Sequence, residues 1–269
     1  MVEVVVLSVM QGIAEFLPIS SSGHLVLGRS LLGLGDVGMR LDIFLHVGTL
    51  ASIFAFYRAI VLRLAGDAFG ANGAQARRES WKYVLKIVVS AIPAGIVGVL
   101  FKDDIESAFS STRAVGCALV FTGLVLMATR FLPRGAKDVS FLRAFLMGVA
   151  QAVAILPGVS RSGSTLAAAR ASGVESGKSA EFSFLMSAPP IAGAALLEIV
   201  KALRSSGPVG DAAASGEVSW ALCAFGAVIA AVVGYFSLAL LLRSLKSDRF
   251  WLFGPYCIVA GVVVLFGVG

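Results

Sequence analysis

A single carboxylate among hydroxyls marks the first stretch of the chain that could do chemistry. Glu15 is the only acid between Val4 and Gly35, and Gln11 precedes it by one helical turn on the same face. An ionisable group in such apolar surroundings costs about 2.5–3.5 kcal/mol on insertion scales, so it predicts a functional site. A carboxylate near hydroxyls and an imidazole suits acid–base or nucleophilic chemistry. The polar side chains that follow are Ser20, Ser21, Ser22 and His24.

A second patch carries positive charge instead. No acid occurs between Val139 and Gly173, and Arg161 stands there among several hydroxyls. A guanidinium with free backbone N–H groups at a helix start binds phosphate and stabilises the charge that develops in phosphoryl transfer. One patch therefore has groups that can react, and the other has groups that can hold phosphate. The hydroxyls of this second patch belong to Ser160, Ser162, Ser164 and Thr165.

The two patches are copies of each other, displaced by 140 residues, and both interrupt strongly apolar sequence. Polar irregular backbone is tolerated at membrane depth only where protein buries it or where it lines a watery cavity. Paired interruptions of this kind indicate a site between two structural repeats. The matching pairs are Gln11 with Gln151, Ser20 with Ser160, Ser22 with Ser162, and Gly23 with Gly163.

Composition sets the class of protein that holds these patches. The chain is 58% hydrophobic and 14% charged, against roughly 25% charged in a soluble domain. We therefore expect an all-α integral membrane protein with one domain over 1–269. The net charge of +6 fits the positive-inside bias of membrane proteins, so we expect no nucleic-acid partner. The six predicted transmembrane spans are 41–57, 84–101, 114–131, 180–200, 219–242 and 250–268.

The loops between these spans differ in charge and so predict an orientation. Lysine and arginine dominate loops 58–83, 130–143 and 243–249, which we assign to the cytoplasm. Acids balance or outnumber the basic residues in loops 102–113 and 201–218, which we assign to the outside.

This orientation predicts how the two patches sit in the membrane. Residues 144–175 must leave the cytoplasm and return to it, so they form a re-entrant helical hairpin. By the repeat, residues 4–35 form a second hairpin that enters from outside. The halves, about 1–135 and 136–269, are then inverted relative to each other, as in many transporters. The alternative is that each patch crosses the membrane once as a broken helix.

The two motifs resemble those of the undecaprenyl-pyrophosphate phosphatase family, which is linked to bacitracin resistance. The family pattern is Glu/Gln-x-x-x-Glu running into Pro-x-Ser-Ser-x-Gly-His, followed later by Pro-Gly-x-Ser-Arg-Ser-x-x-Thr. In this chain the first motif runs from Gln11 to His24 and the second from Pro157 to Thr165. Gln11 stands where many members have Glu, which weakens any scheme in which two carboxylates share a metal.

The resemblance implies an enzyme that hydrolyses undecaprenyl pyrophosphate to undecaprenyl phosphate, recycling the lipid carrier of cell-wall synthesis. It also implies dependence on a divalent cation, Mg²⁺ or Ca²⁺, with Glu15 and Gln11 as tentative ligands. It further implies a bacterial inner-membrane location and a site that faces the periplasm. The sequence does not set the oligomeric state, and a homodimer is compatible with it.

We assign roles on this basis. Ser21 is the predicted nucleophile among the three serines, Glu15 the base, and His24 the acid or base for the leaving group. Arg161 is the fourth predicted catalytic residue, while His46 is left open between packing and a supporting role. The predicted substrate-binding residues are Gln11, Ser20, Ser22, Ser160, Ser162 and Thr165.

Two alternatives remain open at this point. Water activated by Glu15 or His24 could attack the phosphate directly, in place of Ser21. A lipid-phosphate or anion transporter, or a flippase, could use the same inverted-repeat site, because a fold does not fix a function.

Overall fold

The computed structural model describes residues 1–31, 39–204 and 218–267, and every regular element within these ranges is a helix. The predicted all-helical class is therefore confirmed for the described residues. In chain order the elements are α1 (Val2–Ala14), α2 (Ser21–Leu31), α3 (Met39–Phe56), α4 (Arg58–Ala68), α5 (Gly73–Leu100), α6 (Lys102–Phe109), α7 (Thr112–Ala128), η1 (Thr129–Phe131), α8 (Phe141–Val153), α9 (Arg161–Ala171), α10 (Ser176–Leu185), α11 (Ala188–Arg204), α12 (Trp220–Lys246), η3 (Phe250–Leu252) and α13 (Phe253–Gly267).

Four segments among the described residues are long and apolar enough to cross a membrane. They are α5, α7 with η1, α12, and η3 with α13, and they overlap the predicted spans 84–101, 114–131, 219–242 and 250–268. The predicted span 41–57 corresponds to α3. This helix meets the same criterion only together with α4, from which it is bent by 76°.

The predicted span 180–200 is not a single continuous helix. The chain forms α10 and α11 there, with a break at Met186 and Ser187. The physical reason is the pair Pro189 and Pro190. A proline has no N–H to donate and disfavours helical backbone in the residue before it, but it is tolerated in the first turn of a new helix.

Each of the two patches forms a helical hairpin, as predicted, although residues 32–35 of the first lie outside the described part. In the first hairpin the link from α1 to α2 contains Pro18, and in the second the link from α8 to α9 contains Pro157. A serine caps the outgoing helix in both. Ser20 Oγ accepts from the Gly23 N–H at 3.3 Å, and Ser160 Oγ accepts from the Gly163 N–H at 3.1 Å.

The tips of the two hairpins touch at the centre of the molecule. A Cβ atom added to Gly23 would lie 3.1 Å from Gly158 Cα, a tight contact, so glycine favours this close approach. Thr122 of α7 fixes the second tip, because its hydroxyl donates to the Gly158 carbonyl at 2.9 Å and accepts from the Ser160 N–H at 3.0 Å. The Cys257 thiol of α13 contacts the Pro18 carbonyl at 3.4 Å in the first tip.

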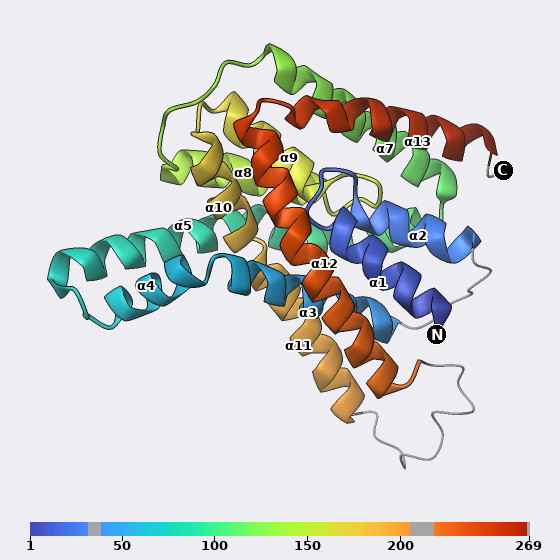
Figure 1. The fold of residues 1–269 in the computed structure, drawn as a ribbon, viewed down its shortest axis with the longest axis horizontal. Helices are drawn as coiled ribbons and strands as arrows, with labels where there is room; N and C mark the ends of the chain where they lie inside the picture. The colour runs from blue at the N-terminus through green and yellow to red at the C-terminus, as the bar shows by residue number, and fades with distance from the viewer. Residues whose placement is uncertain (32–38, 205–217, 268–269) are drawn as a thin grey trace.

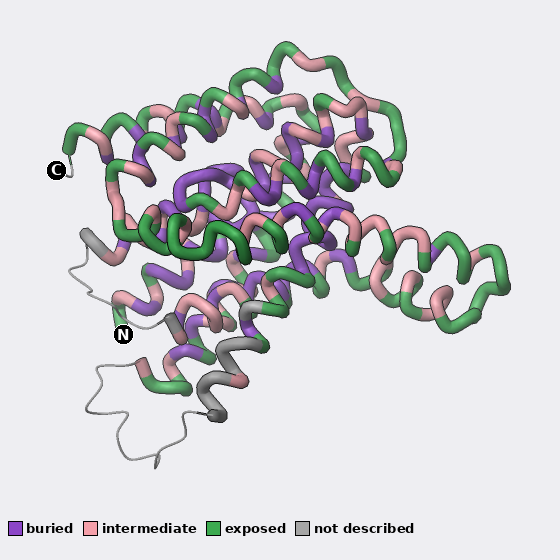
Figure 2. Tube along the Cα trace, turned by 180° about the vertical axis from the view of Figure 1, so that it is seen from behind, coloured by how far each residue is buried: buried purple, intermediate pink, exposed green. Residues whose placement is uncertain are grey.

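Each hairpin packs on a long helix from the other half of the chain. Helix α1 lies along α12, α8 lies along α5, and α7 pairs with α13 (Figure 1). The buried residues concentrate where these elements meet, around the tips (Figure 2). The long helices α5, α12 and α13 expose many large apolar side chains. The site at the tips therefore depends on contacts between both halves.

The ion pairs at the outer ends of the hairpins also cross between elements. Arg29 of α2 pairs with Asp42 of α3, and Arg170 of α9 pairs with Asp248, which follows α12. The Arg170 guanidinium lowers the pKa of Asp248. These pairs tie the open end of each hairpin to a neighbouring helix, so that the hairpin is held at both ends.

Substituting Gly148 by alanine tests the crossing of α8 and α5. The added Cβ would lie 2.9 Å from Ser90 Cα, which is backbone and cannot rotate away. We expect Gly148→Ala to lower the free energy of unfolding by about 1–3 kcal/mol through overpacking. Gly66→Ala is the matched control, because its Cβ would meet only Ala71 Cβ at 3.7 Å. Thermal unfolding in detergent checks both variants, and equal melting temperatures would contradict this packing.

Candidate active site

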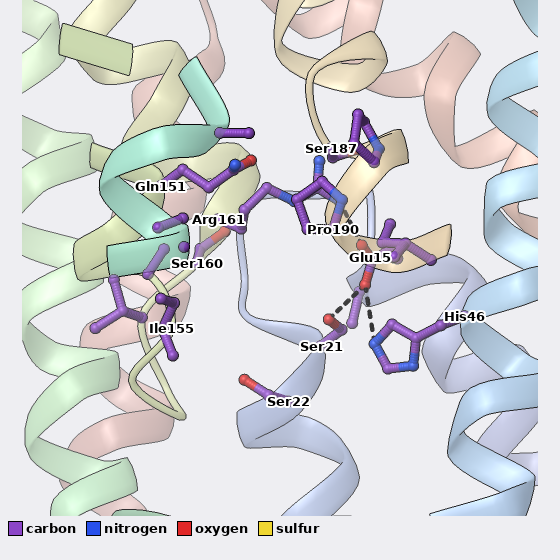
Figure 3. Close-up of a pocket in the computed structure, with 18 residues that line it drawn as sticks. Glu15, Ser21, Ser22, His46, Gln151, Ile155, Ser160, Arg161, Ser187 and Pro190 are labelled. Atoms are coloured by element: carbon purple, nitrogen blue, oxygen red, sulfur yellow. Dashed lines mark hydrogen bonds and ion pairs between the residues drawn. The ribbon is translucent and has the colours of Figure 1, made fainter. Parts of the chain in front are cut away.

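A cavity of about 520 Å³ lies where the two hairpin tips meet. One part of its wall is polar and comes from both hairpins, α3 and the break before α11 (Figure 3). The rest of the wall is apolar and comes mainly from α5, α11 and the second tip. The polar lining residues are Glu15, Ser21, Ser22, His46, Gln151, Ser160, Arg161 and Ser187.

Glu15 is the centre of the polar wall. Its carboxylate is 6% exposed and forms an ion pair with the Arg161 guanidinium through Oε1. Its other oxygen, Oε2, accepts from Ser21 Oγ at 2.7 Å and from Gln11 Nε2 at 3.1 Å. A buried carboxylate needs this degree of compensation to remain charged. The structure thus brings together four residues that the sequence predicted for the site.

His46 is the imidazole that lies beside this carboxylate. Its Nε2 is 3.8 Å from Glu15 Oε2, and its Nδ1 is 2.7 Å from the Asp42 carbonyl oxygen. Because a carbonyl oxygen only accepts, Nδ1 carries the proton in the neutral ring and Nε2 faces the cavity. The sequence offered one signal, a histidine inside a predicted span, which left its role open.

His24 has a different environment from the one predicted. Its Nδ1 is 2.9 Å from the Ser20 carbonyl oxygen, its Nε2 is 2.7 Å from the Tyr256 hydroxyl, and its ring stacks on Tyr256. It is not among the residues that line the cavity. Ser20 has a strained φ of 70°, so the His24 contact helps to hold the backbone just before Ser21. The position of His24 therefore supports a structural role at the tip rather than direct acid–base contact.

The predicted hydroxyl ligands fall into two groups. Ser22 and Ser160 line the cavity, whereas Ser20, Ser162 and Thr165 are buried and engaged elsewhere. Ser20 caps α2, and Ser162 Oγ donates to the Leu17 carbonyl at 3.4 Å, which joins the two tips. Thr165 Oγ1 lies 2.6 Å from Ser183 Oγ, which joins α9 to α10. The second group shapes the site without facing the cavity.

Several buried polar atoms around the cavity lack a hydrogen-bond partner. They are both amide atoms of Gln151, Nη1 of Arg161 and Oε1 of Gln11. A buried polar group without a partner costs about 1–3 kcal/mol, so such groups call for an explanation. The unpaired N–H donors belong to Gln151 and to Arg161, the first residue of α9, and the N-terminus of a helix favours an anion. The arrangement is suited to the oxygens of a phosphate or diphosphate.

Gln151 was not among the predicted site residues. The signal that could have found it was present, because it is the repeat partner of Gln11. Its side chain is 5% exposed and lies across the cavity from Glu15 and His46 (Figure 3). Gln151 was not predicted because the two copies differ one turn later. Glu15 follows Gln11 there, but no carboxylate follows Gln151.

The described residues offer few ligands for a divalent cation. No group of three His, Cys, Asp or Glu side chains lies close enough together in this part of the chain to hold a metal. Glu15 contributes one carboxylate, and Gln11 Oε1 is a buried acceptor without a partner. Mg²⁺ is commonly held by one or two carboxylates together with substrate phosphates and water. These two residues fit a cation of that kind, which requires oxygens of the substrate to complete its coordination.

Comparisons with known proteins agree along the whole chain. A family profile described as bacitracin resistance protein BacA matches residues 4–263. An undecaprenyl-diphosphatase of Halothermothrix orenii is 36% identical over 270 residues, which cover 99% of this chain and 98% of that protein. An undecaprenyl-diphosphatase of Bacteroides thetaiotaomicron is 38% identical over 266 residues, covering 98% and 97%. The resemblance inferred from the two motifs is thereby confirmed.

Separating Glu15 from Arg161 tests whether their ion pair holds the tips together. We expect Glu15→Gln and Arg161→Met each to lower the free energy of unfolding by about 3–5 kcal/mol, because each leaves a buried polar partner uncompensated. The free energy of unfolding of the double variant should fall by much less than the sum of the two single decreases. Unfolding by sodium dodecyl sulfate in mixed micelles measures all three.

An exposed pair provides the control for this cycle. Lys82 Nζ lies 2.6 Å from Glu79 Oε1, and both side chains are largely exposed. Glu79→Gln should therefore cost less than about 1 kcal/mol. Strict additivity of the Glu15 and Arg161 effects would contradict a coupled pair at the tips.

Proposed function

Because the chain belongs to the BacA family of bacitracin resistance proteins, we propose that it hydrolyses undecaprenyl pyrophosphate to undecaprenyl phosphate and phosphate. This reaction recycles the lipid carrier of cell-wall synthesis. The observation that carries the proposal is the set of unpaired buried donors, on Arg161 and Gln151, beside the Glu15–Ser21 hydrogen bond. Such a site can both bind a diphosphate and supply an attacking oxygen.

The proposed reaction begins with Ser21. Its hydroxyl donates to Glu15 Oε2 at 2.7 Å, so Glu15 can accept the proton as Ser21 Oγ attacks the terminal phosphorus. The bond from that phosphorus to the bridging oxygen breaks, and undecaprenyl phosphate leaves with the bridging oxygen. Water then hydrolyses the phosphoserine and releases phosphate. Direct attack by water on the terminal phosphorus is the alternative.

Charge on the phosphate oxygens needs stabilisation during this transfer. Arg161 Nη1 and Gln151 Nε2 are the donors available for it, and Ser160 and Ser22 line the same cavity. His46 Nε2, at 3.8 Å from Glu15 Oε2, can receive the proton that Glu15 has taken up. His24 acts on the reaction through the backbone of Ser20, to which it is hydrogen-bonded.

A divalent cation, Mg²⁺ or Ca²⁺, belongs to the proposal. Glu15 and Gln11 Oε1 would hold it, and when bound it would neutralise charge on the diphosphate. The same two residues keep Ser21 oriented, because Gln11 Nε2 also donates to Glu15 Oε2.

We further propose that the chain has six membrane spans and two re-entrant hairpins arranged as an inverted repeat, with halves of about 1–135 and 136–269. The exchange of hairpins between halves supports this arrangement, since α1 packs on α12 and α8 packs on α5. We also propose, as the family resemblance implies, that the chain lies in the bacterial inner membrane with its cavity open to the periplasm. The charges of the loops support the orientation of its helices.

Phosphate release from undecaprenyl pyrophosphate by the purified protein tests the function. We expect Glu15→Gln, Ser21→Ala and Arg161→Lys each to lower kcat by about 10²–10³-fold, because each removes a proton acceptor, nucleophile or oxygen donor. Ser107→Ala is the control, since Ser107 is exposed on α6 away from the cavity. Absence of release by the unmodified protein, with lipid phosphate transport in proteoliposomes, would favour a transporter instead.

A phosphoserine intermediate would separate the two mechanisms. We expect rapid acid quenching during turnover to trap phosphate on Ser21, identifiable by mass spectrometry of the peptide that contains it. Ser21→Ala should abolish the trapped phosphate and lower kcat as stated above. Retention of turnover by Ser21→Ala would instead assign the attack to water activated by Glu15.

A further inference from the structure

The cavity that holds the Glu15 cluster has an apolar side formed by two helices. Ala91, Ala94 and Gly95 line it from α5, and Pro189 and Pro190 line it from α11. Pro190 lies across the cavity from Gln151 and Ile155 (Figure 3). The polar and apolar walls therefore face one common space.

This apolar side opens at the surface of the molecule. Gly95, Pro189 and Pro190 are exposed although they line the cavity. A Cβ atom added to Gly95 or to Gly98 would meet no heavy atom within 4 Å. At 3.6 residues per turn these two glycines lie on the same face of α5 as Ala91. A strip of α5 that bears almost no side-chain volume therefore leads away from the cavity.

The two helices that border the opening are packed on different neighbours. Helix α5 packs against α4 and α8, whereas α11 packs against α3. The break at Met186 and Ser187 starts α11 at the edge of the cavity, and its two prolines complete the border. The opening therefore results from the way α5 and α11 are packed, and not from a single small side chain.

An unpaired buried side chain on the polar wall calls for a ligand in this cavity. Gln151 lines the cavity and is only 5% exposed, and neither polar atom of its amide has a hydrogen-bond partner. The polar wall suits a diphosphate, and the diphosphate of a prenyl lipid is continuous with a hydrocarbon chain. That chain must leave the polar wall through apolar surroundings, because exposing it to water is unfavourable.

We propose that the gap between α5 and α11 is a lateral portal that binds the isoprenoid units next to the diphosphate. The portal is defined by Ala91, Ala94, Gly95, Pro189 and Pro190. It rests on the proposed function, since it assigns the path of the substrate's lipid chain. The head group lies against Arg161 and Gln151, and the first prenyl units pass along the glycine strip of α5 into the bilayer.

A second apolar cavity competes for this role. Its volume is about 630 Å³, and its wall includes Ile92 and Ile96 of α5 with Phe145 and Val149 of α8. These α5 residues lie on the face of the helix that adjoins the one formed by Ala91, Ala94 and Gly95. The two cavities share only Ile155 as a lining residue. The portal is the direct path, because Gly95, Pro189 and Pro190 line the same cavity as Glu15 and Arg161.

Filling the portal tests the proposal. Gly95→Leu places a side chain in open space, so the fold is retained, and we expect kcat/KM for undecaprenyl pyrophosphate to fall at least about tenfold. Gly66→Leu is the matched control on α4 and should retain the activity of the unmodified protein. Val149→Trp fills the competing cavity and should also retain it. Full activity of Gly95→Leu, or loss only in Val149→Trp, would overturn the portal.

A labelling experiment reads the portal without using turnover. In a Cys117→Ser background, Gly98→Cys and Val99→Cys place thiols on the strip and on the exposed neighbouring face of α5. We expect undecaprenyl phosphate to slow the reaction of N-ethylmaleimide with Gly98→Cys severalfold and to leave Val99→Cys unchanged. Equal protection, or none, would overturn the portal. Failure of the unmodified protein to release phosphate would count against the proposed function, whereas this labelling result bears on the portal alone.

Discussion

The ion pair between Glu15 and Arg161 is the interaction on which the rest of this structure depends. It joins the tips of two hairpins that come from opposite halves of the chain, and it lies where little water can compensate either charge. Neither charge is stable there without the other. Both hairpins must therefore be in place before the site exists, and the packing of α1 on α12 and α8 on α5 brings them there.

The repeat explains how the two tips came to differ in chemistry while keeping one frame. Ser20 and Ser160 are equivalent positions, and each caps the helix that follows it. Ser21 and Arg161 are also equivalent, 140 residues apart, and both contact the same carboxylate. The equivalent of Glu15 in the second copy is Ile155, which lines the apolar side. Equal backbone frames thus present a hydroxyl in one copy and a guanidinium in the other.

The sequence predicted the parts of the site that lie within the motifs, and it missed those that depend on distant packing. The two motifs and their charges were sufficient to predict that Glu15 and Ser21 lie near Arg161. Nothing local to His24 indicated that Tyr256, more than two hundred residues later, would engage its ring. The two prolines at the start of α11 could have predicted the break before it. The sequence was assigned a single span there because the apolar run has the length of one. The position of His46 beside Glu15 could not be predicted, because it depends on how α3 packs against the first hairpin tip.

The position of the site at broken helices follows from hydrogen bonding in an apolar medium. Inside an intact helix every backbone N–H is used, so a helix interior offers a phosphate only its side chains. A chain that presents N–H groups and a guanidinium in apolar surroundings therefore has to end one helix there and start another. That break exposes backbone groups, which Thr122, Ser20 and Ser160 satisfy. The polar side chains and unpaired backbone groups of the site are then confined to the two tips. The long helices can remain regular and apolar; they are α5, α7, α12 and α13.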